Sequence, residues 1–252
     1  LASKRRGGGA TSVVHVGPAD LDEEDLATYT RMSPLLAGSR VLLVEPHPYQ
    51  RRRLEDRLRL IRGHERISLE PMAAAVCPGD GDSAFYRISD RFFRDFKETG
   101  WLYLLRYWAG LDKQHLMREL EVFCNQTGKV WLFKSLGVFP GTFPSTMAAW
   151  LPYIEEVRVP CHTPSGLLAA ADMGPEAVDV LIVDAEGYDT QLVSMFAELR
   201  GFDPVIVMFE WHLHLNKPAK LNDLVSLVRD LHARGYEIHR HNHDVVAVAV
   251  PA

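Results

Sequence analysis

The stretch from Val178 to Asp189 reads VDVLIVDAEGYD and is the most informative part of the chain. Its first half is a short apolar run rich in β-branched residues, which is typical of a strand buried on both faces of a parallel sheet. Its second half ends the run with Asp184, Glu186 and Gly187. Three other runs share the apolar pattern: Val13 to Val16 (VVHV), Val41 to Val44 (VLLV) and Val205 to Phe209 (VIVMF).

Amphipathic helical patterns separate these runs. They cover 48–62, 192–199 and 221–231, with apolar residues spaced three and four apart. Strands that alternate with helices predict an α/β fold: a Rossmann-like, doubly wound, mostly parallel sheet of about seven strands. The runs 236–240 and 245–250 flank a polar turn and predict a C-terminal antiparallel hairpin.

The predicted organisation is a single domain over residues 1–252. Residues 1–11 are basic and glycine-rich and are expected to be a flexible N-terminal segment. Residues 83–155 interrupt the strand and helix alternation, and we interpret them as a helical insertion or lid. Two candidate helices lie in this insertion, Asp90 to Trp108 and Leu111 to Gln126.

Composition excludes several classes of protein. Hydrophobic residues make up 47% and charged residues 24% of the 252, as in ordinary globular domains. The net charge of −5 argues against a surface built for nucleic acid, and no apolar stretch is long enough for a membrane span. Cys77, Cys124 and Cys161 form no CxxC pair, so we expect neither a cysteine-rich zinc site nor a disulfide framework, and a reducing, cytoplasmic compartment. The oligomeric state is not indicated.

Ligands of open α/β sheets bind beyond the carboxyl ends of the strands, so the residue after each apolar run is a candidate. These residues are Gly17, Glu45, Asp184 with Glu186, and Glu210. Three of the four runs are followed by a carboxylate. Each acid alone is as easily explained as a helix cap or a surface charge.

Glu45 ends the second run, where a carboxylate can accept both hydroxyl groups of an adenosine ribose. Such a site suits a nicotinamide dinucleotide or S-adenosylmethionine. The chain lacks GxGxxG after Gly17 and carries five acids between Asp20 and Asp25, which repel a diphosphate but not a sulfonium cation. These acids also suit a helix N-terminus, so only Gly17 and Asp20 remain site candidates here.

These segments carry a resemblance to a known family. Val41 to Pro48 (VLLVEPHP) resembles the "EPxP" segment of the FkbM-type methyltransferases, and Val178 to Asp189 resembles their "VDxLKIDVEGxE" segment. Ile67 to Val76, which contains Ala75, is similar to the third strand that leads into "AAV". The family's first motif is close to "DxGANxG", where this chain has HVGPADL from His15 to Leu21.

The resemblance implies a class I, S-adenosylmethionine-dependent methyltransferase that acts on a hydroxyl group of a small-molecule or glycan acceptor. It implies that Gly17 lies under the cofactor and that Glu45 holds the ribose. It places Asp184 and Glu186 on the methionine or acceptor side. The full set of implied cofactor-binding candidates is Gly17, Asp20, Glu45, Ala75 and Asp184.

Methyl transfer needs a group that takes the acceptor's proton, and the candidates are Asp184, Glu186 and His212. No metal belongs to this interpretation. Two alternatives stay open. One is a non-catalytic binding module of the same fold. The other is a metal-dependent hydrolase that uses Asp184, Glu210, His212 and His214, since His212 and His214 share a face of an extended segment.

Overall fold

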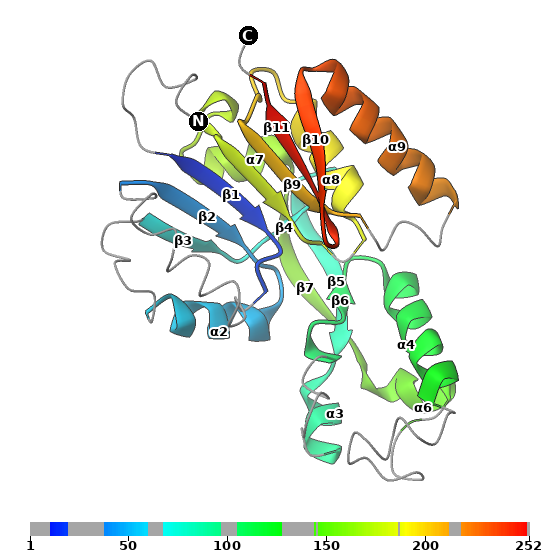
Figure 1. Ribbon diagram of the computed structural model, residues 1–252. Coiled ribbons are helices and arrows are strands. Elements are labelled where there is room, and N and C mark those ends of the chain that lie inside the picture. The colour runs from blue at the N-terminus through cyan, green and yellow to red at the C-terminus, as the bar shows by residue number, and fades with distance from the viewer. Residues whose placement is uncertain are drawn as a thin grey trace. The chain divides into compact units, whose positions relative to one another are not determined.

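The structure is a computed structural model that describes residues 11–19, 38–59, 68–96, 105–127, 144, 146–185, 187–211 and 218–250 (Figure 1). Contacts between Cα atoms divide the chain into two compact units. Unit 1 comprises residues 1–81 and 160–252, and unit 2 comprises residues 82–159. Among the described residues, no helix has the length and apolarity needed to cross a membrane.

Unit 1 contains a mixed seven-stranded sheet with the order β10-β11-β9-β8-β1-β2-β3. Its neighbouring strands pair in parallel from β3 to β9, whereas β11 is antiparallel to both β9 and β10. The strands are β1 (Ser12–Val16), β2 (Arg40–Val44), β3 (Ser68–Met72), β8 (Val180–Val183), β9 (Ile206–Glu210), β10 (Tyr236–His241) and β11 (Asp244–Ala249).

Alternating side chains of the central strands enter two separate apolar cores, because successive residues of a strand point to opposite faces. On one face, Val14 and Val16 pack in a cluster with side chains of α7 (Pro164–Ala170), α8 (Asp189–Ala197) and α9 (Pro218–Ala233). On the other face, Val13 packs with side chains of α2 (Pro48–Leu58). Helices therefore cover both faces of the sheet, as the buried apolar runs predict (Figure 1).

All four apolar runs of the sequence form strands of this sheet, and small differences occur at their ends. Strand β8 begins at Val180 rather than Val178, and just before it the Asp179 side chain accepts the Ser12 N–H. The C-terminal strands pair antiparallel from Tyr236↔Ala249 to His241↔Asp244, with a turn at residues 242–243. Thr11, the last residue of the predicted flexible segment, is buried, and its carbonyl accepts the Arg40 N–H.

Unit 2 spans nearly the same residues as the predicted insertion. It contains α3 (Asp90–Asp95), β6 (Ala109–Gly110), α4 (Lys113–Thr127), α6 (Met147–Trp150) and most of β5 (Gly81–Ile88) and of β7 (Ile154–His162). Its core is aromatic: Phe92 stacks on Trp150 with 4.7 Å between ring centroids, and Phe123 meets the edge of Trp150. This unit has its own apolar core; its role as a lid stays a prediction.

The helix predicted from Asp90 to Trp108 is confirmed for Asp90–Asp95 and is wrong for residues 96 and 105–108, which are not α-helical; residues 97–104 lie outside the described part of the chain. Helix α3 ends at Asp95, and residues 109–110 form β6, which pairs antiparallel with β5 at Tyr86↔Gly110. The apolar spacing of this segment instead places Phe92, Phe93 and Leu105 in the core of unit 2. The second predicted helix is correct, as α4.

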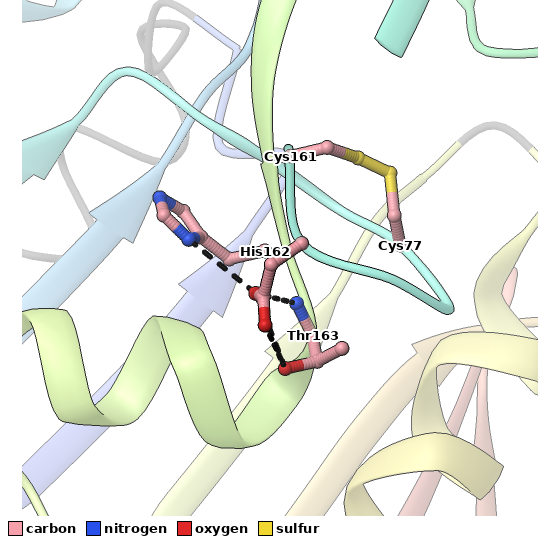
Figure 2. The surroundings of a disulfide bond; sticks show 5 residues. Cys77, Cys161, His162 and Thr163 are labelled. Atoms are coloured by element: carbon pink, nitrogen blue, oxygen red, sulfur yellow. Dashed lines mark hydrogen bonds and ion pairs between the residues drawn. A yellow bond between two sulfur atoms is a disulfide. The ribbon is translucent and has the colours of Figure 1, made fainter. Parts of the chain in front are cut away.

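A disulfide joins Cys77 and Cys161 in unit 1 (Figure 2). Parallel pairing of β4 (Ala75–Val76) with the end of β7 brings the two cysteines together, with 5.7 Å between their Cα atoms. Next to it, Asp80 accepts the Thr163 N–H at 2.8 Å and lies 3.6 Å from the His162 ring. The expectation of no disulfide was wrong, because 84 residues separate two positions that only the tertiary fold brings together.

Candidate functional site

Three candidate site residues, Glu45, Gly17 and Asp184, form a row at the carboxyl edge of the sheet in unit 1. Val16 is in register with Val44 and with Val183, so the residues that follow them also lie side by side. Three backbone hydrogen bonds continue the ladder beyond the strands. They run from Gly17 N–H to Val44 O (2.9 Å), from Glu45 N–H to Met72 O (3.0 Å) and from Asp184 N–H to Val16 O (2.9 Å).

Gly17 occupies the centre of this row and cannot carry a side chain there. Its φ is +78°, in the left-handed region that favours glycine. A Cβ at Gly17 would overlap the carbonyl oxygen of Asp184 on the neighbouring strand. The loop after β1 and the turn after β8 are therefore in direct backbone contact, and Gly17 is what permits it.

The first motif of the family that this chain resembles differs here at His15 and Ala19. Ala19 has a φ of +46° and stands where the "DxGANxG" motif has Asn, a residue that tolerates this conformation better. His15 stands where the motif has its acid. It is 6% exposed, and burial lowers its pKa to about 4, so this side chain is neutral at pH 7.

Glu45 is buried, with 5% of its surface exposed. Its Oε1 accepts the backbone N–H of His47 at 2.7 Å, which turns the EPHP segment into the start of α2. His47 is the N-cap of that helix, and its Nδ1 accepts the N–H groups of Tyr49 and Gln50. A carboxylate has about four acceptor positions, and the hydrogen bond from the His47 N–H uses one of those of Glu45.

Asp184 is exposed at the end of β8, and the turn that follows it is held by a residue that the sequence analysis did not select. Asp189, at the first turn of α8, is 0% exposed. Its Oδ1 accepts the Ala185 N–H at 3.0 Å and its Oδ2 accepts the Gly187 N–H at 2.9 Å. An acid two residues after a glycine, at a helix start, was the available signal.

The other predicted residues are less well supported by their positions. Ala75 is buried on β4, where it pairs with Cys161, and is not in the row. Glu210 ends β9, opposite Asp244 of the hairpin. The remaining candidates, Asp20, Glu186, His212 and His214, lie outside the described residues. Within the described parts of the chain, no three His, Cys, Asp or Glu side chains are grouped so that they could hold a metal ion.

The row therefore combines a backbone surface without side chains at Gly17 and carboxylates on both sides of it. Neighbouring strands are about 4.8 Å apart, so the backbones of Glu45 and Asp184 are separated by about 10 Å across Gly17. An elongated ligand lying over Gly17 can present hydroxyl groups to Glu45 and positive charge to Asp184. This is the chemistry of a nucleoside with a cationic substituent.

Comparison with known proteins agrees with this geometry. A search of curated proteins found no significant match. The profile of the Methyltransferase FkbM domain matches residues 15–238, which include every element from β2 to α9 and each member of the row described above. The chain therefore belongs to the FkbM methyltransferase domain family.

Proposed function

We propose that this protein is an S-adenosylmethionine-dependent methyltransferase that methylates a hydroxyl group of a small-molecule or glycan acceptor. Its sheet would then be the Rossmann-like sheet of such enzymes, with six strands in one direction and β11 reversed. The observation that carries the proposal is the alignment of Glu45, Gly17 and Asp184 on three adjacent parallel strands. Family membership supplies the reaction class, and the row supplies a place for the methyl donor.

The residues of the row fit S-adenosylmethionine. Glu45 would accept the two ribose hydroxyl groups, Gly17 would let the nucleoside lie close to the backbone, and Asp184 would face the positively charged methionine portion. A buried carboxylate such as Glu45 forms stronger hydrogen bonds than a neutral acceptor. These contacts need neither a glycine-rich diphosphate loop nor a metal ion.

S-Adenosylmethionine supplies a methyl group on a positively charged sulfur. The acceptor oxygen forms a bond to the methyl carbon, the carbon–sulfur bond breaks with its electron pair on sulfur, and the hydroxyl proton leaves. We assign Asp184 to that proton, because it is the exposed carboxylate beside Gly17. The rest of the row holds the two reactants in line, which is the larger part of catalysis for such a displacement.

The experiment is a search for methyl transfer with a defined acceptor panel. Purified protein is incubated with S-adenosylmethionine and mono- and oligosaccharides or small alcohols, and S-adenosylhomocysteine formation is measured by mass spectrometry. We expect acceptor-dependent turnover that falls about 100-fold or more in Asp184→Asn, as loss of a general base does. Asp179→Asn, at the opposite edge of the sheet, should retain turnover. Equal turnover in wild type and Asp184→Asn would remove Asp184 from the reaction.

The Cys77–Cys161 disulfide argues against the cytoplasmic compartment that the cysteine spacing suggests. Disulfides persist in oxidising compartments and are rare in reducing ones. We therefore propose that the enzyme works in an oxidising compartment. Mass spectrometry of the protein isolated from its native cells under thiol-blocking conditions tests this, and we expect only Cys124 to be alkylated. Alkylation of all three cysteines would place the protein in a reducing compartment.

A further inference from the structure

We propose that Asp189 is a positioning residue that keeps the turn after β8 in the shape that cofactor binding requires. The inference rests on the proposed function, because the cofactor is S-adenosylmethionine. Asp189 itself is completely buried and is not expected to touch the ligand. It would act through the backbone N–H groups of Ala185 and Gly187 and, from there, on the contact between Asp184 and Gly17.

Asp189 uses both of its carboxylate oxygens as hydrogen-bond acceptors. Oδ1 binds the Ala185 N–H and Oδ2 binds the Gly187 N–H, so one side chain holds both ends of the turn. Hydrogen bonds from backbone N–H groups to an ionised carboxylate are stronger than those to a neutral acceptor. A carboxylate with two equivalent oxygens is suited to this task, whereas an amide offers only one acceptor.

The turn also contacts the backbone at Gly17, over which the nucleoside would lie. On its other side, the turn begins at Asp184, whose N–H is fixed by Val16 O and whose carbonyl oxygen lies directly against Gly17. There is no space between Gly17 and this carbonyl for even a methyl group. Any rotation of the turn therefore moves Asp184 O into the Gly17 loop or away from it, and changes the surface on which the nucleoside lies.

Asp179 can be compared with Asp189. Asp179 also accepts a backbone N–H with its carboxylate, that of Ser12 at 2.9 Å, but at the amino edge of the same sheet. Removal of either carboxylate therefore disturbs one end of β8, and only Asp189 lies at the end that carries the row. Asp179→Asn is thus a matched control for Asp189→Asn.

The test measures S-adenosylhomocysteine affinity by calorimetry and thermal stability in wild type, Asp189→Asn, Asp189→Glu and Asp179→Asn. We expect Asp189→Asn to weaken binding at least tenfold at a temperature where the variant is folded. Asp189→Glu, which keeps two acceptor oxygens, should recover part of that loss. Asp179→Asn, which leaves the turn's backbone hydrogen bonds intact, should bind within about threefold of wild type.

A second measurement does not depend on the folding of a variant. When S-adenosylhomocysteine is added to the wild-type protein, the backbone amide signals of Ala185 and Gly187 should shift in NMR spectra, and that of Ser12 should not. Wild-type binding without these shifts, or with unchanged affinity in folded Asp189→Asn, would overturn the positioning role while leaving the proposed function in place. A folded wild-type protein that binds no S-adenosylhomocysteine would overturn the proposed function itself and, with it, this role.

Discussion

Gly17 is the residue with the least freedom in the candidate site. Gly17→Ala adds a methyl group that overlaps Asp184 O, at a φ of +78° that alanine adopts at a cost. Gly38 has nearly the same φ, +79°, but open space around its missing Cβ. Gly38→Ala should therefore lose about 1 kcal/mol of unfolding free energy, and Gly17→Ala about 2 kcal/mol more together with S-adenosylhomocysteine binding. Urea denaturation and calorimetry measure these losses, and equal losses in the two variants would show that the Asp184 contact is unimportant.

His15 makes the stability of the protein depend on pH. Burial lowers its pKa from 6.5 to about 4, so below pH 6.5 the unfolded chain binds a proton that the folded chain does not. The unfolding free energy therefore falls as the pH is lowered from about 6.5 to 4, and this residue alone should account for about 2 kcal/mol between pH 7 and 5.

His15→Leu removes this contribution and leaves all other titrating groups in place. In urea denaturation at pH 7 and pH 5, the variant should lose less stability on acidification than the wild type, by that same amount. If both proteins lose stability equally, His15 is not protected from protonation by burial.

Some strands and helices could be predicted from local sequence patterns, and others could not. The runs at 13–16 and 41–44 become strands because nearly every side chain in them is buried, on one face of the sheet or the other. Pro48 starts α2 as expected, but the cap is the His47 ring, an acceptor that a list of common capping residues omits. The helix expected over Asp90 to Trp108 ends at Asp95, and β6, which follows the described residues 105–108, forms by a tertiary contact with β5.

The disulfide between the ends of β4 and β7 is also such a contact, and it has a measurable consequence. A cross-link that closes a loop of this length, 84 residues, stabilises the folded state by about 4 to 5 kcal/mol in a chain-entropy estimate. Reductant should therefore lower the urea midpoint of the wild-type protein. The double variant Cys77→Ser and Cys161→Ser should start at the lower midpoint and not respond to reductant. A wild-type midpoint that ignores reductant would mean that the bond is absent or adds nothing.

At the scale of the whole chain, the sequence was sufficient to predict the row but not the contacts that shape it. Each acid of the row follows an apolar strand, and parallel strands end at one edge, so Glu45 and Asp184 could be found by position alone. Asp189 could not be selected in this way, because its importance lies in two hydrogen bonds to backbone groups of a turn. The neighbours of Gly17 could not be predicted in this way either. They depend on the order of the strands in the sheet, which is set by pairing between segments far apart in the sequence.

Calorimetry with S-adenosylhomocysteine and NAD shows whether the row binds the nucleoside of S-adenosylmethionine. We expect S-adenosylhomocysteine to bind and NAD not to bind, because the chain offers a ribose-binding carboxylate without a glycine-rich diphosphate loop. Glu45→Gln keeps an acceptor for the His47 N–H but loses the charge, and should weaken S-adenosylhomocysteine binding by about 1.5 to 3 kcal/mol. Tight binding of NAD, or no binding of S-adenosylhomocysteine at millimolar concentration by the folded protein, would contradict the account.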